Sequence, residues 1–179
     1  MLTQYSTVGS RRIFEGRVVN LRVDTIDLGS HGQVEREVVE HHGAVVMAPV
    51  DDRGRLLMVR QYRHAAGQEL LELPAGTLEP GEAPETTAQR ELREEIGFSA
   101  RRLAPMGGFY SAPGFCDEYL HFFIATDLWP DPKPGDVDEE IEVVAVPLHE
   151  ADELARAGKI IDGKTLAGLF LLRLAQEPR

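Results

Sequence analysis

The chain has 179 residues, of which 19 are Lys or Arg and 30 are Asp or Glu, so its formal net charge at pH 7 is −11. This acidic balance is unsuited to coating nucleic acid, and the apolar runs, such as 44–50, are far shorter than the roughly 20 residues that a membrane span requires. The single cysteine, Cys116, and an N-terminus with no basic stretch before an apolar one predict a cytoplasmic protein without disulfides or a signal peptide.

The first 40 residues are predicted to form strands. Apolar residues are spaced among polar ones from residue 11, a Gly-Ser-His-Gly turn occupies 29–32, and valines continue the return strand to residue 39. No helical pattern in this stretch would cover the strands. We therefore expect an antiparallel strand region at 1–40, followed by the main domain at 41–179.

Short apolar segments bounded by turn residues predict the strands of the main domain. A buried strand at 44–50 is followed by an Asp-Asp-Arg-Gly turn and then by its hairpin partner at 56–60. Further strands are expected at 69–73, 103–110, 119–126 and 141–146.

The hydrophobic period changes to that of a helix at 84–96. Ala88, Leu92 and Ile96 recur every four residues, Pro84 suits the first helical turn, and Gly97 suits the end of the helix. Two more helices are expected at 148–157 and 166–175. Strands interleaved with helices in this order predict an α/β fold with a mixed sheet and helices packed against it.

Three glutamates gather on one face of the helix at 84–96. At about 100° per residue, Glu91 and Glu95 lie ~40° apart, with Glu94 beside them. Like charges four residues apart destabilise a helix by about 0.2–0.5 kcal/mol, whereas clustered carboxylates bind hard cations such as Mg²⁺. A solvated acidic face is the alternative interpretation of the same pattern.

The wider spacing favours the metal site. Gly76, then Glu82, then the run from Arg90 to Phe98 (Arg-Glu-Leu-x-Glu-Glu-x-Gly-Phe) match the Nudix box at every fixed position. The chain therefore resembles a Nudix hydrolase. This resemblance implies the Nudix α/β/α sandwich with a mixed β-sheet and an N-terminal antiparallel strand extension. It also implies hydrolysis of a nucleoside diphosphate linked to another moiety, with Mg²⁺ or, in its place, Mn²⁺ or another divalent cation.

The resemblance also assigns roles within the box. It implies that Glu91 and Glu95 are the principal metal ligands and that Glu94 is a further ligand or positions water. Arg90 is implied to orient the glutamates and to belong to the catalytic set. The main-chain carbonyl of Ala75 is implied to be a metal ligand. Glu82 is implied to support the site, and Gly76 to let its loop approach the helix.

Outside the box the chain is similar to the ADP-ribose pyrophosphatases. Pro113 follows Phe98 by 15 residues, the spacing associated with that activity, and its Ser-Ala-Pro-Gly-Phe-Cys-Asp-Glu context resembles their substrate loop. The similarity implies substrate contacts from Pro113, Glu118, Arg63 and the pair Arg36 and Glu37. Three of these residues also have an ordinary structural explanation. Pro113 would simply end a strand, and Arg36 and Arg63 would be surface charges.

The reaction implied is attack of a water on one phosphorus of ADP-ribose, which gives AMP and ribose 5-phosphate. Glu139 aligns best with the general base of similar enzymes; Glu140 and Glu94 remain alternatives, and an exposed acidic loop would look the same. Other nucleoside diphosphate sugars, such as GDP-mannose or ADP-glucose, are the rival substrates, and a nucleotide-binding module without turnover is the rival class. A homodimer built through the N-terminal strands is expected, because their exposed edges need a partner.

Overall fold

The computed structural model describes residues 5–135 and 140–176, which form two compact units. The first unit is the chain up to Gly43 together with Tyr110–Tyr119, and the second comprises Ala44–Phe109 and the residues from Leu120 onward. The boundary expected at residue 40, between an N-terminal region and the main domain, stays a prediction. No pattern in the sequence indicated that a segment more than 60 residues farther along would join the first unit.

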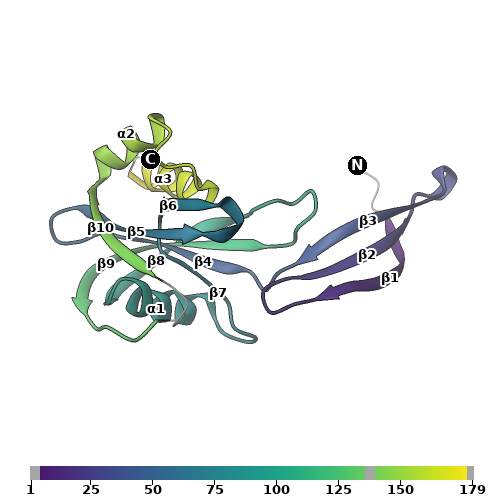
Figure 1. Ribbon diagram of the computed structural model, residues 1–179, viewed down its shortest axis with the longest axis horizontal. Coiled ribbons are helices and arrows are strands. Elements are labelled where there is room, and N and C mark those ends of the chain that lie inside the picture. Colours follow the sequence, from purple (N-terminus) through teal and green to yellow (C-terminus); the bar gives the residue numbers. More distant parts are fainter. Residues whose placement is uncertain (1–4, 136–139, 177–179) are drawn as a thin grey trace. The chain divides into compact units, whose positions relative to one another are not determined.

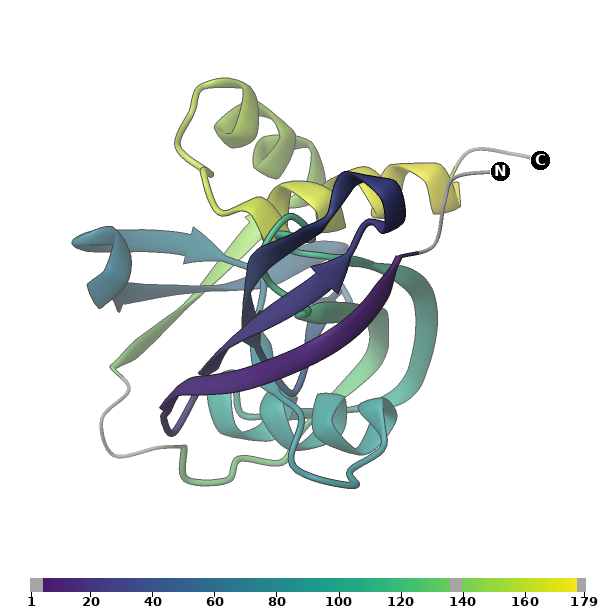
Figure 2. The same cartoon turned by 90° about the vertical axis from the view of Figure 1, so that its right-hand side faces the viewer.

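The first unit is a three-stranded antiparallel sheet (Figure 2). Its strands are β1 (Ser6–Glu15), β2 (Asn20–Asp27) and β3 (Gln33–Glu40), in the order β1-β2-β3. The turn predicted at 29–32 is a short 3-10 helix, η1 (Gly29–His31), closed by Gly32 at a φ of 82° that suits glycine. The N-terminal strands expected from residue 11 thus begin five residues earlier.

The segment Tyr110–Tyr119 is fastened to β3 by backbone hydrogen bonds. Val39 N–H donates to the Phe115 carbonyl at 2.7 Å, and Asp117 N–H donates to the Val39 carbonyl at 3.1 Å. His41 N–H in turn donates to the Asp117 carboxylate at 2.8 Å. The loop that contains Pro113 is therefore held by the N-terminal sheet.

The second unit contains two sheets (Figure 1). The four-stranded sheet has the order β7-β4-β9-β8, from β7 (Ala75–Thr77), β4 (Ala44–Pro49), β9 (Tyr119–Pro130) and β8 (Phe98–Tyr110). The three-stranded sheet has the order β10-β5-β6, from β10 (Ile141–Pro147), β5 (Arg55–Arg63) and β6 (Gln68–Glu72). The 3-10 helix η2 (His64–Ala66) joins β5 to β6. Because β4 pairs parallel to β9 and antiparallel to β7, the four-stranded sheet is mixed, as expected.

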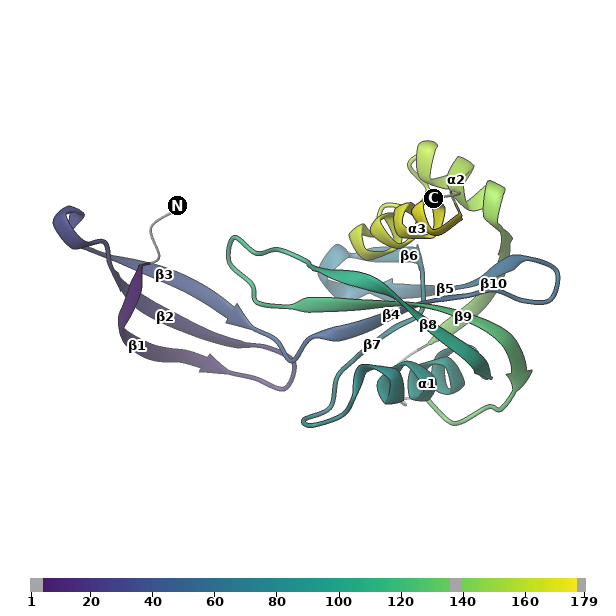
Figure 3. The ribbon, with the colours of Figure 1, turned by 180° about the vertical axis from the view of Figure 1, so that it is seen from behind.

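Helices cover the two outer faces of this unit (Figures 1 and 3). Every residue of β4 is buried, and successive side chains point to opposite faces. Val46 packs in a cluster with residues of α2 (Leu148–Arg156) and α3 (Gly163–Gln176), whereas Val45 packs with residues of α1 (Pro84–Glu95). This layering is the predicted α/β/α sandwich.

The helix predicted at 84–96 is α1, and its ends follow the expected signals. Pro84 occupies the first turn, and Gly97, with a φ of 76°, reverses the chain after Ile96. The next strand, β8, begins at once at Phe98 rather than near residue 103. No helix within 5–135 or 140–176 has the length and apolar character to cross a bilayer.

Candidate active site

The centre of the candidate site is the approach of β7 to α1. A Cβ atom built on Gly76 would lie 1.9 Å from the carboxyl carbon of Glu91 and 1.9 Å from one of its oxygens. Only glycine leaves room for that carboxylate against the backbone. The structure therefore provides a cradle in which a helix carboxylate lies directly beside main-chain polar groups.

Glu95 is connected to the same short strand. Its Oε2 accepts a 3.0 Å hydrogen bond from the Ala75 N–H, and the residue is only 8% exposed. A buried carboxylate is costly unless it is hydrogen-bonded or paired with a cation. The Ala75-Gly76 segment thus contacts two of the three helix glutamates. Ala75 donates its N–H to Glu95, and Gly76, which has no side chain, leaves space for the Glu91 carboxylate.

Arg90 lies between the acidic groups. Its guanidinium contacts Glu82 at 3.1 Å, Glu91 at 2.5 Å and Glu94 at 3.1 Å, and it donates to the Thr77 carbonyl at 3.2 Å. The hydrogen bond from Arg90 holds the pKa of Glu82 below its ordinary value. Burial lowers the pKa of Arg90, but hydrogen bonds to Glu82 and the charge of Glu91 outweigh it and raise that pKa.

Glu94 has a second cation, because its other oxygen accepts from the Lys133 Nζ. In the parts of the chain that the structure describes, no three His, Cys, Asp or Glu side chains converge closely enough to hold a metal by themselves. Glu94 is paired with Arg90 and Lys133. A cation at Glu91 and Glu95 would need oxygens from the backbone, water or a substrate to complete its shell.

Arg63 lies near this cluster, but its guanidinium is paired with Glu72. Its Nε and Nη2 donate to the two oxygens of Glu72 at 2.9 and 2.7 Å, a bidentate pair. The hydrogen bonds from Arg63 to Glu72 raise the pKa of Arg63, and the charge of Glu95 adds to the rise. Its predicted contact with substrate stays a prediction.

Three polar residues that the sequence interpretation passed over are buried in the second unit, and a fourth, Lys164, is partly buried. Glu72 and Thr165 are 0% exposed, and Lys164 donates to Glu72 from the start of α3. The Nε2 of Gln61, which is 6% exposed, has no hydrogen-bond partner within the described residues. The signal that could have found Glu72 is its position between Leu71 and Leu73, where a charged residue separates apolar ones.

The other predicted substrate residues belong to the first unit. Arg36 and Glu37 are exposed on β3, where the Arg36 guanidinium donates to the Glu35 carbonyl. Pro113 is exposed in the loop fastened to β3, and the partly buried Glu118 has an oxygen 3.6 Å from His41 Nδ1. Of the two candidate bases in the acidic loop, Glu139 lies outside the described residues and Glu140 is exposed just before β10.

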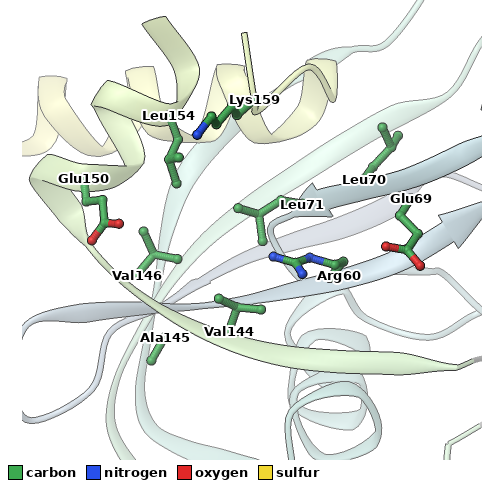
Figure 4. Close-up of a pocket in the computed structure, with 10 residues that line it drawn as sticks. All are labelled: Arg60, Glu69, Leu70, Leu71, Val144, Ala145, Val146, Glu150, Leu154 and Lys159. Carbon is green, nitrogen blue, oxygen red and sulfur yellow. The ribbon is translucent and has the colours of Figure 1, made fainter. Parts of the chain in front are cut away.

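A cavity of about 440 Å³ lies on the face of the β10-β5-β6 sheet that is turned away from α1 (Figure 4). Arg60, Glu69, Glu150 and Lys159 surround an apolar floor that includes Leu71. None of the box residues lines this cavity. The cavity is therefore separate from the carboxylate cluster on α1.

Comparison with known proteins agrees with this geometry. The NUDIX domain model matches residues 40–168. The chain is 39% identical to an ADP-ribose pyrophosphatase of Bacillus subtilis, over 95% of this chain and 93% of that one. It is 34% identical to a GDP-mannose pyrophosphatase of Salmonella arizonae, over 97% and 98% of the two chains. A crystal structure of an ADP compounds hydrolase superposes with a TM-score of 0.87 at 24% identity, over 98% and 95% of the two chains.

Proposed function

The chain belongs to the Nudix hydrolase family, and from this premise we propose that it hydrolyses the pyrophosphate of ADP-ribose to AMP and ribose 5-phosphate. The observation that supports the reaction class is the close approach of Gly76 to Glu91, which leaves the carboxylate lying against the backbone of β7 with no side chain between them. The substrate rests on the likeness over nearly the whole chain to an ADP-ribose pyrophosphatase and on the position of Pro113.

Divalent metals are in general use in this family, and the residues present suit Mg²⁺ or Mn²⁺. Glu91, Glu95 and the Ala75 carbonyl would hold the ion, because hard cations prefer oxygen ligands and the Gly76 cradle admits the Glu91 carboxylate. A bound Mg²⁺ supplies positive charge to the pyrophosphate oxygens and makes a bound water more acidic.

The protein's own residues keep this arrangement in place. Arg90 spans Glu82, Glu91 and Glu94, so it limits the rotamers that the box glutamates adopt. Glu94 acts as a further ligand or as the group that positions water. Glu139, Glu140 or Glu94 accepts the proton of the attacking water, with Glu139 the first choice.

Substrate recognition is assigned to the first unit and to Arg63. Arg36 and Arg63 supply guanidinium groups, which suit phosphate oxygens, and Glu37 and Glu118 supply acceptors for hydroxyl or amino groups. Pro113 stiffens the loop that carries Glu118, because its ring fixes φ.

The test is a panel of ADP-ribose, ADP-glucose, GDP-mannose, NADH and a diadenosine polyphosphate, each incubated with Mg²⁺ and analysed by chromatography. The proposal predicts the highest kcat/KM for ADP-ribose, with AMP and ribose 5-phosphate as products. GDP-mannose is the second candidate, because a GDP-mannose pyrophosphatase is similar over nearly the whole chain. Turnover of no compound in the panel would indicate a binding module and overturn the proposal.

A further inference from the structure

Each residue of the segment from Glu72 to Gly76, which leads from β6 into β7, contacts another element of the second unit. The Pro74 carbonyl accepts from Met47 N–H at 2.9 Å, and Ala75 N–H donates to Glu95. Gly76 abuts the Glu91 carboxylate. The two residues before Pro74 are held by the beginning of α3.

Glu72 is the first of these anchors. Its carboxylate is buried and accepts hydrogen bonds from Nε and Nη2 of Arg63 and from Nζ of Lys164. Two cations around one buried carboxylate offset its loss of hydration and fix its position. The cations come from β5 and α3, so Glu72 ties three elements together at the end of β6.

Thr165 is the second anchor, and its hydroxyl is oriented. The Oγ1 donates to Asp162 Oδ2 at 2.6 Å and accepts from Leu73 N–H at 2.8 Å. A hydroxyl has one proton, so the bond to Asp162 turns its lone pairs toward Leu73. Asp162 also accepts the Thr165 N–H at 2.9 Å and thereby caps the start of α3.

These contacts form a continuous path from α3 to the box glutamates. Leu73 is followed by Pro74, whose ring fixes φ, and then by Ala75, which is bonded to Glu95. A shift of Leu73 is therefore passed on to Ala75 and Gly76 rather than absorbed by rotation. We propose that Thr165, oriented by Asp162, is a positioning residue that sets the Ala75-Gly76 segment at the distance from Glu91 and Glu95 that a divalent cation needs.

This inference deepens the proposed function, because it concerns the cation that the hydrolysis would use. The decisive measurement is Mn²⁺ binding in the absence of substrate, followed by electron paramagnetic resonance, together with the melting temperature of the metal-free protein. Thr165→Val keeps the shape of the side chain but removes the hydroxyl, which leaves Leu73 N–H unpaired. Positioning residues around metal ligands typically contribute about 10–100-fold to affinity or activity, so we expect the Mn²⁺ Kd to rise at least about tenfold.

Two further variants separate positioning from stability. Thr165→Ser keeps the hydroxyl and should bind Mn²⁺ within about twofold of the wild type. Arg173→Met removes the pair between Arg173 and Asp152, which joins α3 to α2 without contacting the 72–76 segment. It should lower the melting temperature and leave the Mn²⁺ Kd unchanged.

Equal Mn²⁺ affinity in Thr165→Val and the wild type would overturn the inference, whatever the change in stability. Should Thr165→Val fail to fold, Asp162→Asn takes its place: it weakens the acceptor that orients the hydroxyl, and unchanged Mn²⁺ affinity there would overturn the inference equally. A wild type that binds Mn²⁺ but hydrolyses no sugar nucleotide would overturn the proposed function alone, since the comparison of affinities does not require turnover.

Discussion

Gly76 and Glu91 lie so close together that a Cβ on Gly76 would occupy the position of the Glu91 carboxyl group. The contact joins the short strand β7 to the helix α1, and it explains why the box begins with a glycine 15 residues before its first helix glutamate. The requirement is for space, because the φ of Gly76 is not in the left-handed region.

Gly76→Ala should therefore lower activity far more than stability. The new methyl group would displace the end of a flexible side chain, which can swing away from Arg90 and from the cradle. We expect kcat/KM to fall about 10–100-fold, while the free energy of unfolding falls by about 1 kcal/mol, a decrease in melting temperature of roughly 2–4 °C. Gly163→Ala is the matched control, because a Cβ there meets no atom within 4 Å and should change neither quantity appreciably. Full activity in Gly76→Ala would show that the close approach has no role in the site.

Glu91→Gln and Glu95→Gln should each reduce turnover by several orders of magnitude without unfolding the protein. In Glu91→Gln, Arg90 keeps its pairs with Glu82 and Glu94. In both variants the loss of one negative charge relieves repulsion on the helix. The melting temperature without metal should stay the same or rise slightly. Glu85→Gln, at an exposed position in the first turn of the same helix, should keep wild-type activity. Near wild-type turnover in both box variants would refute the assignment of these residues.

The helix that carries the box could be predicted from the sequence almost to the residue, because its signals are local. A proline in the first turn, a glycine after the last turn and apolar residues every four positions all lie within the element itself. The buried strand β4 was equally predictable from its continuous apolar run. The prediction that Arg90 orients the glutamates rested on family resemblance, and the structure places its guanidinium among three of them.

What could not be predicted depends on contacts between distant residues. Strand β7 has three residues, too few for any periodicity, and it exists because Val45 and Val46 pair with it across the sheet. The fastening of Phe115 to Val39 joins residues 76 positions apart. The buried Glu72 could be recognised as an anchor only once Lys164 was seen beside it, 92 positions along the chain.

Asp51 should contribute stability that acid removes. Burial raises its pKa, but hydrogen bonds from Arg55 and from Arg53 N–H outweigh this effect and hold the pKa below its ordinary value of 3.8. A carboxylate with a depressed pKa stabilises the fold fully above the unfolded value and loses this contribution as pH falls through the folded value. Asp51→Asn should therefore melt roughly 2–4 °C below the wild type at pH 7, for a loss of about 1 kcal/mol. This difference should begin to narrow only when the pH falls below the ordinary value of 3.8. Thermal melts from pH 3 to 7, with exposed Asp52→Asn as control, measure it; a gap that does not depend on pH would contradict the prediction.

The N-terminal sheet should mediate a homodimer. Strand β1 lies at the edge of its sheet and exposes Val8, Ile13 and Phe14. The pairing with β2 skips Val8 and Ile13, so two bulges interrupt the edge, which disfavours strand addition and favours association through the exposed side chains. Light scattering at micromolar concentration should give twice the mass of one chain. Phe14→Lys should shift the protein toward monomer, whereas Ile161→Lys, at an exposed position in the second unit, should not. A fully active wild-type monomer would refute the dimer.

Glu118 is expected to contribute to the choice of substrate. Its carboxylate lies 3.6 Å from His41 Nδ1, but that nitrogen accepts a hydrogen bond from Gly43 N–H at 3.0 Å and so carries no proton to donate to Glu118. The carboxylate thus retains acceptor capacity for a sugar hydroxyl.

A misfit in an apolar pocket discriminates only about 10–200-fold between substrates, whereas specific hydroxyl hydrogen bonds reach roughly 10⁴-fold. Glu118→Ala should therefore narrow the kcat/KM preference for ADP-ribose over ADP-glucose, or lower kcat for both if the residue acts on the metal instead. Asp117→Asn, next to it in the same loop, controls for disturbance of the loop. An unchanged substrate preference together with an unchanged kcat in Glu118→Ala would exclude Glu118 from the site. If the wild type hydrolyses GDP-mannose or ADP-glucose faster than ADP-ribose, the substrate assignment is wrong, but the proposed metal-dependent hydrolysis still stands.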